Sequence, residues 1–179
     1  MDKVLHKKQG YTGDLSGDQW QRLKGLLPNR KGQAGRPMKL KLREVINAIF
    51  YVVWTGCQWV NLPKTYPHCK SVYYHFRKWA RDGTWARLNR ALVYLERQKR
   101  GRLPHPSGGV IDSQSAKTTE SGGERSYDGG KHVNGRKRYI LTDTLGNLLA
   151  VAAHPAGLAD SLGAPQVFAA LSPYWQHTL

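Results

Sequence analysis

The chain has 179 residues, 40% of them hydrophobic, and carries 28 Lys and Arg against 12 Asp and Glu, a formal net charge of +16. This hydrophobic content suffices for a packed core and excludes a disordered tail. The longest apolar run, Val45 to Trp54, is about half of the roughly 20 residues that a membrane-spanning helix needs. The polar N-terminus lacks a secretion signal's apolar core, and the two cysteines exclude a disulfide-rich scaffold. We therefore expect a cytoplasmic protein.

The positive charge is concentrated in the first part of the chain. Residues 1–105 carry 22 Lys and Arg against 6 Asp and Glu, whereas residues 106–179 carry 6 of each. This asymmetry predicts a polyanion-binding domain of residues 1–105, followed by a second domain of residues 106–179. Nucleic acid is the first partner to consider. An anionic membrane is less favoured because no stretch is cleanly amphipathic, and a basic protein without a special partner is the remaining alternative.

Four helices are predicted in the first domain. Residues 14–27 carry a capping-box pattern at Ser16 and Gln19. Residues 42–55 give the strongest helical pattern, and Gly56 is placed to end that helix. Residues 68–81 form the third helix, and Thr84 is placed to cap the fourth. The apolar sides that we expect are Leu42, Val45, Ile46, Ile49, Phe50 and Val53 in the second helix, Val72, Phe76 and Trp79 in the third, and Trp85, Leu88, Leu92 and Leu95 in the fourth.

Beyond a linker at 101–109 the hydrophobic period changes from that of a helix to that of a strand. We expect a short strand at 109–113 that ends at Asp112, a polar loop at 114–135, and two strands at 138–143 and 147–153. The residues 143–147 between the two strands suit a hairpin turn. A last helix is expected at 160–171. The fold class is therefore α+β, with a helical domain followed by a sheet domain.

The helices 42–55 and 68–81 resemble a helix-turn-helix with a long turn, in which the second helix would enter the major groove of DNA. Lysine and arginine side chains on such a helix neutralise phosphates and release counterions. The alternative is a solvated, charged helix face. The Gly35–Pro37 stretch could reach a minor groove, although a plain linker explains it equally well. The candidate DNA contacts are Arg36, Lys39 and Lys41 in the preceding loop, and Lys70, Ser71, Tyr74, Arg77, Lys78 and Arg81 in the helix.

Asp112 is the candidate catalytic and metal-binding residue. A carboxylate at the end of an apolar strand can hold Mg²⁺, but phosphodiester cleavage by two metal ions needs at least two further carboxylates. From spacing alone Asp112 suits a structural role as well. Asp143 is explained as a turn residue and Asp160 as a helix cap, whereas Glu120, Glu124 and Asp128 fall in the polar loop and are expected to be solvated.

A basic cluster, Arg136, Lys137 and Arg138, precedes the strand expected beside Asp112. It could grip the DNA backbone near a catalytic centre, or it could be a charged strand end that discourages aggregation. The residues Cys57, His68, Cys69 and His75 do not have the spacing of a zinc site, and we expect packing roles for them.

Taken in order, these stretches resemble bacterial transposases of the insertion-sequence-five family, within the DDE superfamily. The resemblance runs from about residue 11 to 165. It rests on the segments 35–37, 42–51, 55–59, 62–63, 72–79 and 82–85, and in the second part on 111–115, 127–131, 135–138, 143–146, Asp160 and 163–164.

The resemblance implies a helix-turn-helix-like DNA-binding domain and an RNase H-like α/β domain of which this chain holds the first three strands. Such enzymes cut and join DNA at terminal inverted repeats, using two aspartates and a glutamate to hold Mg²⁺ or Mn²⁺. Asp112 matches the first aspartate. The second aspartate normally lies in an Ala-Asp-x-Gly-Tyr stretch and the glutamate on a later helix, and the sequence contains neither motif.

Two explanations fit these missing motifs: a first reading frame completed by frameshifting, and a decayed or truncated copy. We therefore expect a transposase part that is inactive alone, acting in the bacterial cytoplasm at the nucleoid. Its expected partners are double-stranded DNA and a second-frame product or a further copy. The rival hypothesis is an inactive truncation that occupies the repeats and represses transposition. We also expect residues 106–179 to be less stable than residues 1–105, because a three-stranded remnant leaves an open sheet edge.

Overall fold

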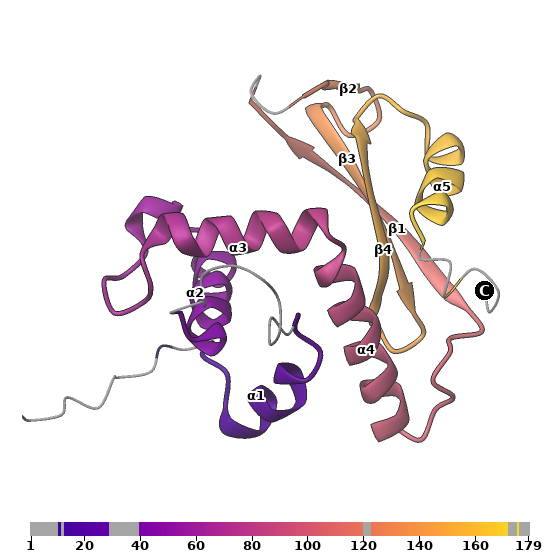
Figure 1. Ribbon diagram of the computed structural model, residues 1–179. Coiled ribbons are helices and arrows are strands. Elements are labelled where there is room, and N and C mark those ends of the chain that lie inside the picture. The colour runs from indigo at the N-terminus through magenta and orange to yellow at the C-terminus, as the bar shows by residue number, and fades with distance from the viewer. Residues whose placement is uncertain (1–10, 12, 29–39, 120–122, 172–174, 176–179) are drawn as a thin grey trace, which may run out of the picture. The chain divides into compact units, whose positions relative to one another are not determined.

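The structure is a computed structural model that describes residues 11, 13–28, 40–119, 123–171 and 175. The chain divides into two compact units, residues 1–88 and residues 89–179, which we call the helical unit and the sheet unit (Figure 1). The division falls inside one continuous helix, so the domain boundary that we expect at 105/106 stays a prediction. No helix among the described residues is long and apolar enough to cross a membrane.

The helical unit contains α1 (Gly17–Lys24), α2 (Leu42–Thr55), the short 3₁₀ helix η1 (Trp59–Asn61), α3 (Cys69–Arg81) and the first turn of α4 (Thr84–Lys99). The capping box predicted at the start of α1 is present: Ser16 accepts from the backbone N–H of Gln19, whose side chain accepts from the N–H of Ser16. The helix itself is shorter than the expected 14–27. Helix α2 has the expected bounds and ends at Gly56, whose φ of 67° is left-handed as predicted.

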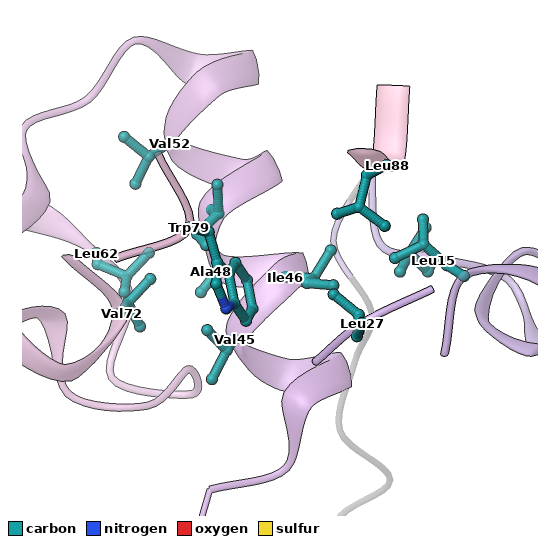
Figure 2. Close-up of a cluster of buried hydrophobic side chains, with 12 residues drawn as sticks. Leu15, Leu27, Val45, Ile46, Ala48, Val52, Leu62, Val72, Trp79 and Leu88 are labelled. Carbon is teal, nitrogen blue, oxygen red and sulfur yellow. The ribbon is translucent and has the colours of Figure 1, made fainter. Parts of the chain in front are cut away.

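The core of the helical unit is built around α2. Its residues Val45, Ile46 and Ala48 are fully buried and belong to one cluster with Val72 and Trp79 of α3 (Figure 2). The expected apolar stripe is wrong at its last member, because Val53 is 70% exposed. Val53 lies two turns beyond Ile46 on the same side of the helix, but it does not belong to the core cluster that contains Ile46.

The first part of α4 contributes to the core of the helical unit and its later part to the core of the sheet unit. The buried side of the helix therefore changes along its length. Leu88 belongs to the core of the helical unit, whereas Val93 belongs to the core of the sheet unit. These two positions differ by about 140° around the helix axis. The predicted stripe is therefore wrong at Leu92 and Leu95, each of which is 41% exposed.

The start of α4 also differs from the prediction. Thr84 is itself the first residue of the helix and is fully buried, and Asp82 supplies the cap. One carboxylate oxygen of Asp82 accepts from both the N–H and the hydroxyl of Thr84.

The sheet unit contains four antiparallel strands and one helix. The strands are β1 (Gly109–Lys117), β2 (Ser126–Asp128), β3 (Val133–Asp143) and β4 (Leu148–Pro155), followed by α5 (Asp160–Ala169). The central strand β3 pairs with β1, β4 and the short β2. Strand β2 lies at the end of the sheet away from the β3–β4 turn (Figure 1). The expected loop at 114–135 is thus wrong, because β1 extends four residues further and β2 and the start of β3 fall within it.

The two faces of this sheet differ in what covers them. Tyr139 and Leu141 of β3 are buried in a cluster with Val167 of α5, so odd-numbered β3 positions form the covered face. Gly163 lies directly on the ring of Tyr139, where a Cβ atom would come within 2.0 Å of the ring. Even-numbered β3 positions form the opposite face, which we call the open face.

The β3–β4 turn is built on Asp143, as predicted. The carboxylate accepts from the backbone N–H groups of Leu145 and Asn147 and from the Asn147 side chain. It also forms an ion pair of 2.6 Å with Arg97 of α4, and both side chains are nearly inaccessible to solvent. This pair joins residues 46 positions apart, so no local sequence pattern predicts it.

Candidate nucleic-acid interface and catalytic carboxylate

Helix α3 presents a basic and aromatic outer surface. Along one side of the helix, Lys70, Arg77 and Arg81 recur at helical spacing and are exposed. Tyr73 and Tyr74 between them are 41% and 60% exposed. This surface is hollowed, and the residues that line the hollow are Lys70, Tyr73, Tyr74, Arg77, Lys78, Arg81 and Asp82. The structure therefore brings together five of the six candidate contacts predicted on this helix. The sixth, Ser71, is half-buried.

The opposite side of α3 fixes this surface in place. Val72 is fully buried and Trp79 is 2% exposed, and the indole N–H of Trp85 donates to the backbone carbonyl of Phe76 at 3.1 Å. At the helix start, Nδ1 of His68 accepts from the N–H of Lys70. His68 is thus a capping residue.

Among the described residues, Asp82 is the only acid that lines the hollow, and its side chain is hydrogen-bonded to the start of α4. The hydrogen bond from the Thr84 hydroxyl holds the pKa of Asp82 below its usual value. The carboxylate therefore stays ionised while it caps α4.

The basic loop before α2 is described only at its end. Lys41 is exposed and precedes the first residue of α2, where its carbonyl accepts from the N–H groups of Glu44 and Val45. Arg36 and Lys39, with the Gly35–Pro37 stretch, lie outside the described residues.

Asp112 lies in the middle of β1, not at its end as expected. It pairs in register with Ile140, an even-numbered β3 position, so its side chain lies on the open face. It is exposed, and its Oδ1 accepts from the N–H of Ser113 at 2.8 Å. Its same-face neighbours on β1 are Val110, which is 59% exposed, and Gln114. Asp112 thus stands where the open face changes from apolar to polar.

The basic cluster 136–138 lies inside β3, not before a strand, so its members alternate between the two faces. Arg138 is exposed on the open face and donates to Gln114. Since Gln114 and Arg138 form the pair next to Asp112 and Ile140 on that face, Arg138 is a diagonal neighbour of Asp112, roughly 7 Å away. Arg136, on the same face, donates to the carbonyls of Gly123 and Glu124 and supports the loop before β2.

Lys137 points the other way and is 5% exposed on the covered face. Its ammonium donates to the carbonyl of Leu158 and to the carboxylate of Asp160, and lies 3.4 Å from that of Asp128. Burial lowers the pKa of Lys137, but the bonds to Asp160 and Asp128 outweigh it and hold the pKa above its usual value. Lys137 is therefore a charged anchor of the sheet unit, and we leave it out of the proposed DNA contacts.

The sequence predictions for the two carboxylates that bind Lys137 are both wrong. Asp128, expected to be solvated, is 7% exposed, and the hydroxyl of Ser115 donates to it at 2.6 Å. This bond leads the effects that lower the pKa of Asp128 to about 2. Asp160, expected to cap α5, instead accepts from Lys137 and Tyr139, and the bond from Lys137 lowers its pKa. Among the acids that we expected to be solvated, Glu124 is exposed, and Glu120 lies outside the described residues.

The carboxylates do not assemble into a closed metal site. No group of three or more His, Cys, Asp or Glu side chains suitable for a metal ion occurs within 11, 13–28, 40–119, 123–171 and 175. Mg²⁺ takes about six oxygen ligands in octahedral geometry, and Asp112 offers one carboxylate. Asp128, Asp143 and Asp160 are occupied by Lys137 or Arg97. The described residues thus supply one carboxylate ligand for a divalent metal ion, which is too few for a metal-dependent step.

Comparison with known families covers both parts of the chain. Residues 15–89 match the family model for IS4/5-family transposases, and residues 103–179 match the transposase DDE domain. The first match corresponds to the helical unit and the second lies within the sheet unit. No curated protein and no solved structure matches the chain.

Proposed function

Because the chain belongs to the IS4/5 family of DDE transposases, we propose that it binds the terminal inverted repeats of an insertion sequence and contributes Asp112 as the first metal-binding carboxylate for strand cleavage and transfer. The fold agrees with this family: a helical N-terminal part precedes a partial RNase H-like α/β domain. Its strands β1, β3 and β4 correspond to the three that the sequence predicts, and β2 is a short addition. DDE transposases generally use divalent metal ions, and Mg²⁺ or Mn²⁺ is the ion that we propose for Asp112.

The observation that carries the DNA-binding proposal is the outer surface of α3. Four cations and two exposed tyrosines lie on it, with Asp82 as the one acid beside them among the residues that the structure describes. A helix fits the major groove of B-DNA, where arginine can pair with guanine edges and both basic residue types can neutralise phosphates. The positive charge of this surface exceeds the single negative charge of Asp82, as expected of a surface that binds a polyanion. Tyrosine exposed to 60% also suits a groove of DNA better than water.

Asp112 is a suitable metal ligand because, within the described residues, its exposed carboxylate does not hold a buried cation or a turn in place. The other described aspartates of the sheet unit hold Lys137, Arg97 or a turn, whereas within the described residues Asp112 accepts from the amide of its neighbour Ser113. On this open face the Arg138 guanidinium can bind a DNA phosphate, while the neighbouring Asp112 carboxylate can bind the cation that accompanies the phosphate.

Salt dependence of DNA binding tests the role of α3. For a random-sequence duplex of 30 base pairs, the slope of log K against log salt is about −0.9 for each neutralised phosphate. Arg77→Ala should therefore reduce the slope by about one unit, so that the loss of affinity between 50 and 200 mM salt shrinks roughly 3-fold. The matched control is Arg22→Ala, which removes an exposed arginine from α1 and should leave the slope unchanged. An unaltered slope for Arg77→Ala would remove α3 from the DNA interface.

A further inference from the structure

The polar half of the open face contains an exposed aromatic residue at the opposite end from Asp112. In β2 the side chains alternate, so Asp128, 7% exposed, lies on the covered face and Tyr127, 56% exposed, on the open face. The register supports this placement independently, because Tyr127 pairs with Asn134, an even-numbered β3 position. Tyr127 therefore shares one face with Arg138 and Asp112.

The ring of Tyr127 is oriented without being covered. Its hydroxyl lies 3.0 Å from Nδ1 of His132, the last residue of the turn between β2 and β3. His132 has a φ of 53° and is the one non-glycine residue with positive φ in the described part of the chain. Such a conformation is disfavoured and persists where the surroundings impose it, often at binding sites. The hairpin thus holds the phenol by its edge and leaves the ring exposed.

The positive charge of the sheet unit is gathered around this end of the sheet. All six Lys and Arg of residues 106–179 lie between positions 117 and 138. Of these, Arg125, Lys131 and Arg138 are exposed; Lys117 is also exposed, but it pairs with Gly135, an odd-numbered β3 position, and so lies on the other face. Glu124 is the one exposed acid of this region within the residues that the structure describes. An anionic ligand that reaches Arg138 therefore passes into a positively charged region as it approaches Tyr127.

The distance between the two ends suits a short nucleic acid strand. Asn134 and Ile140, the β3 partners of Tyr127 and Asp112, are six residues apart. At about 3.3 Å per residue this separation is about 20 Å. A stacked DNA strand rises 3.4 Å per nucleotide, so about six nucleotides cover it.

We propose that Tyr127 is a stacking platform for an unpaired base of a DNA single strand that runs across Arg138 to Asp112. Exposed aromatic rings on a positively charged sheet surface bind single strands by stacking, whereas the bases of a duplex stack on one another and are not available. The proposal rests on the proposed function for the Asp112 end of this path. It adds a second DNA-binding surface to that of α3, with a different ligand form.

The test uses the full chain and two probes, a fluorescein-labelled 12-nucleotide oligo(dT) and a 12-base-pair dA·dT duplex. Tyr127→Ala should weaken binding of the single strand about 10-fold, whereas Tyr127→Phe, which keeps the ring, should stay within about 2-fold of the unaltered chain. Binding of the duplex should change less than 2-fold in both variants. Tyr74→Ala on α3 is the matched control, because it also removes an exposed tyrosine and should weaken duplex binding only. Oligonucleotides with 5-bromouracil should crosslink, on irradiation, to the peptide that contains Tyr127.

The outcomes separate this inference from the proposed function. Single-strand affinity that is unchanged in Tyr127→Ala overturns the stacking platform, even if Arg77→Ala shows that α3 binds duplex DNA. A specific loss with Tyr127→Ala supports it, even if α3 fails its own test. Equal losses of single-strand and duplex binding also overturn it. A change in self-association on sedimentation without a change in DNA affinity overturns it as well, because the ring then belongs to a protein interface.

Discussion

The ion pair between Arg97 and Asp143 gives the sharpest stability prediction. The two side chains are 7% and 0% exposed and their charged atoms lie 2.6 Å apart. Removing one partner of such a buried pair costs about 3–5 kcal/mol, because the other charge is left in a poorly solvated place. We expect Asp143→Asn to fall in this range, since it also weakens the turn. We expect Arg97→Met to cost less, about 2 kcal/mol, because Asp143 keeps its bonds to Leu145 and Asn147.

The double variant reveals whether the two charges depend on each other. In a chain that already carries Asp143→Asn, Arg97→Met should cost little or even restore stability, because it removes the unpaired guanidinium. Hydrogen exchange of peptides from residues 139–150 measures these changes, with peptides of α2 as an internal reference. Equal costs of Arg97→Met with and without Asp143→Asn would refute the coupling.

The same pair predicts a response to acid. Burial raises the pKa of Asp143, but hydrogen bonds from Asn147 and Arg97 outweigh it and hold the pKa below its usual value. A carboxylate with a lowered folded-state pKa contributes stability above its unfolded pKa of about 3.9, and this contribution is lost as pH falls through the folded value. Arg97→Met should therefore make the sheet unit lose less of its stability between neutral pH and pH 2.

Three further substitutions test the two faces of the sheet. Gly163→Ala should destabilise the sheet unit by about 1–3 kcal/mol, measured by urea unfolding, because the new methyl group would meet the ring of Tyr139 at 2.0 Å. Asp112→Asn should change the free energy of unfolding by less than about 0.5 kcal/mol, since that side chain is exposed, while abolishing transposition. Asp128→Asn should destabilise the chain at pH 7 but not at pH 2, because the pKa of Asp128 is lowered to about 2 and its stabilising charge is lost as pH falls to that value. A pH-independent effect of Asp128→Asn would contradict this account.

Local signals predicted the helical unit well. The Ser16 capping box, the bounds of α2 and the left-handed Gly56 all follow from interactions within a few residues of sequence, which a pattern can record. The errors at Val53 and Leu92 have a different origin. Whether a helix position is buried depends on which other element reaches it, and helical spacing carries no information on where a neighbour ends.

The second part of the chain was harder to predict because polar residues occupy strands. Gln114, Ser115 and the run 136–138 look like loop sequence, yet β1 and β3 contain them. Their polar side chains are accommodated in two ways: by an open face, and by the Lys137 anchor with Asp128 and Asp160. Ion pairs between residues far apart in sequence leave no local pattern, so Asp128 could not be recognised as buried.

One signal for Lys137 was nevertheless present. Tyr139, Leu141 and Asp143 continue its parity along β3, and all three are buried with it. Extending the expected strand 138–143 backwards by a few residues would have placed Lys137 inside and Arg136 and Arg138 outside. The same parity places Arg138, Asp112 and Tyr127 on one open face. The three cations 136–138 therefore do not form a single DNA-binding patch: Lys137 holds the sheet together, Arg136 supports the loop before β2, and Arg138 is exposed on the open face.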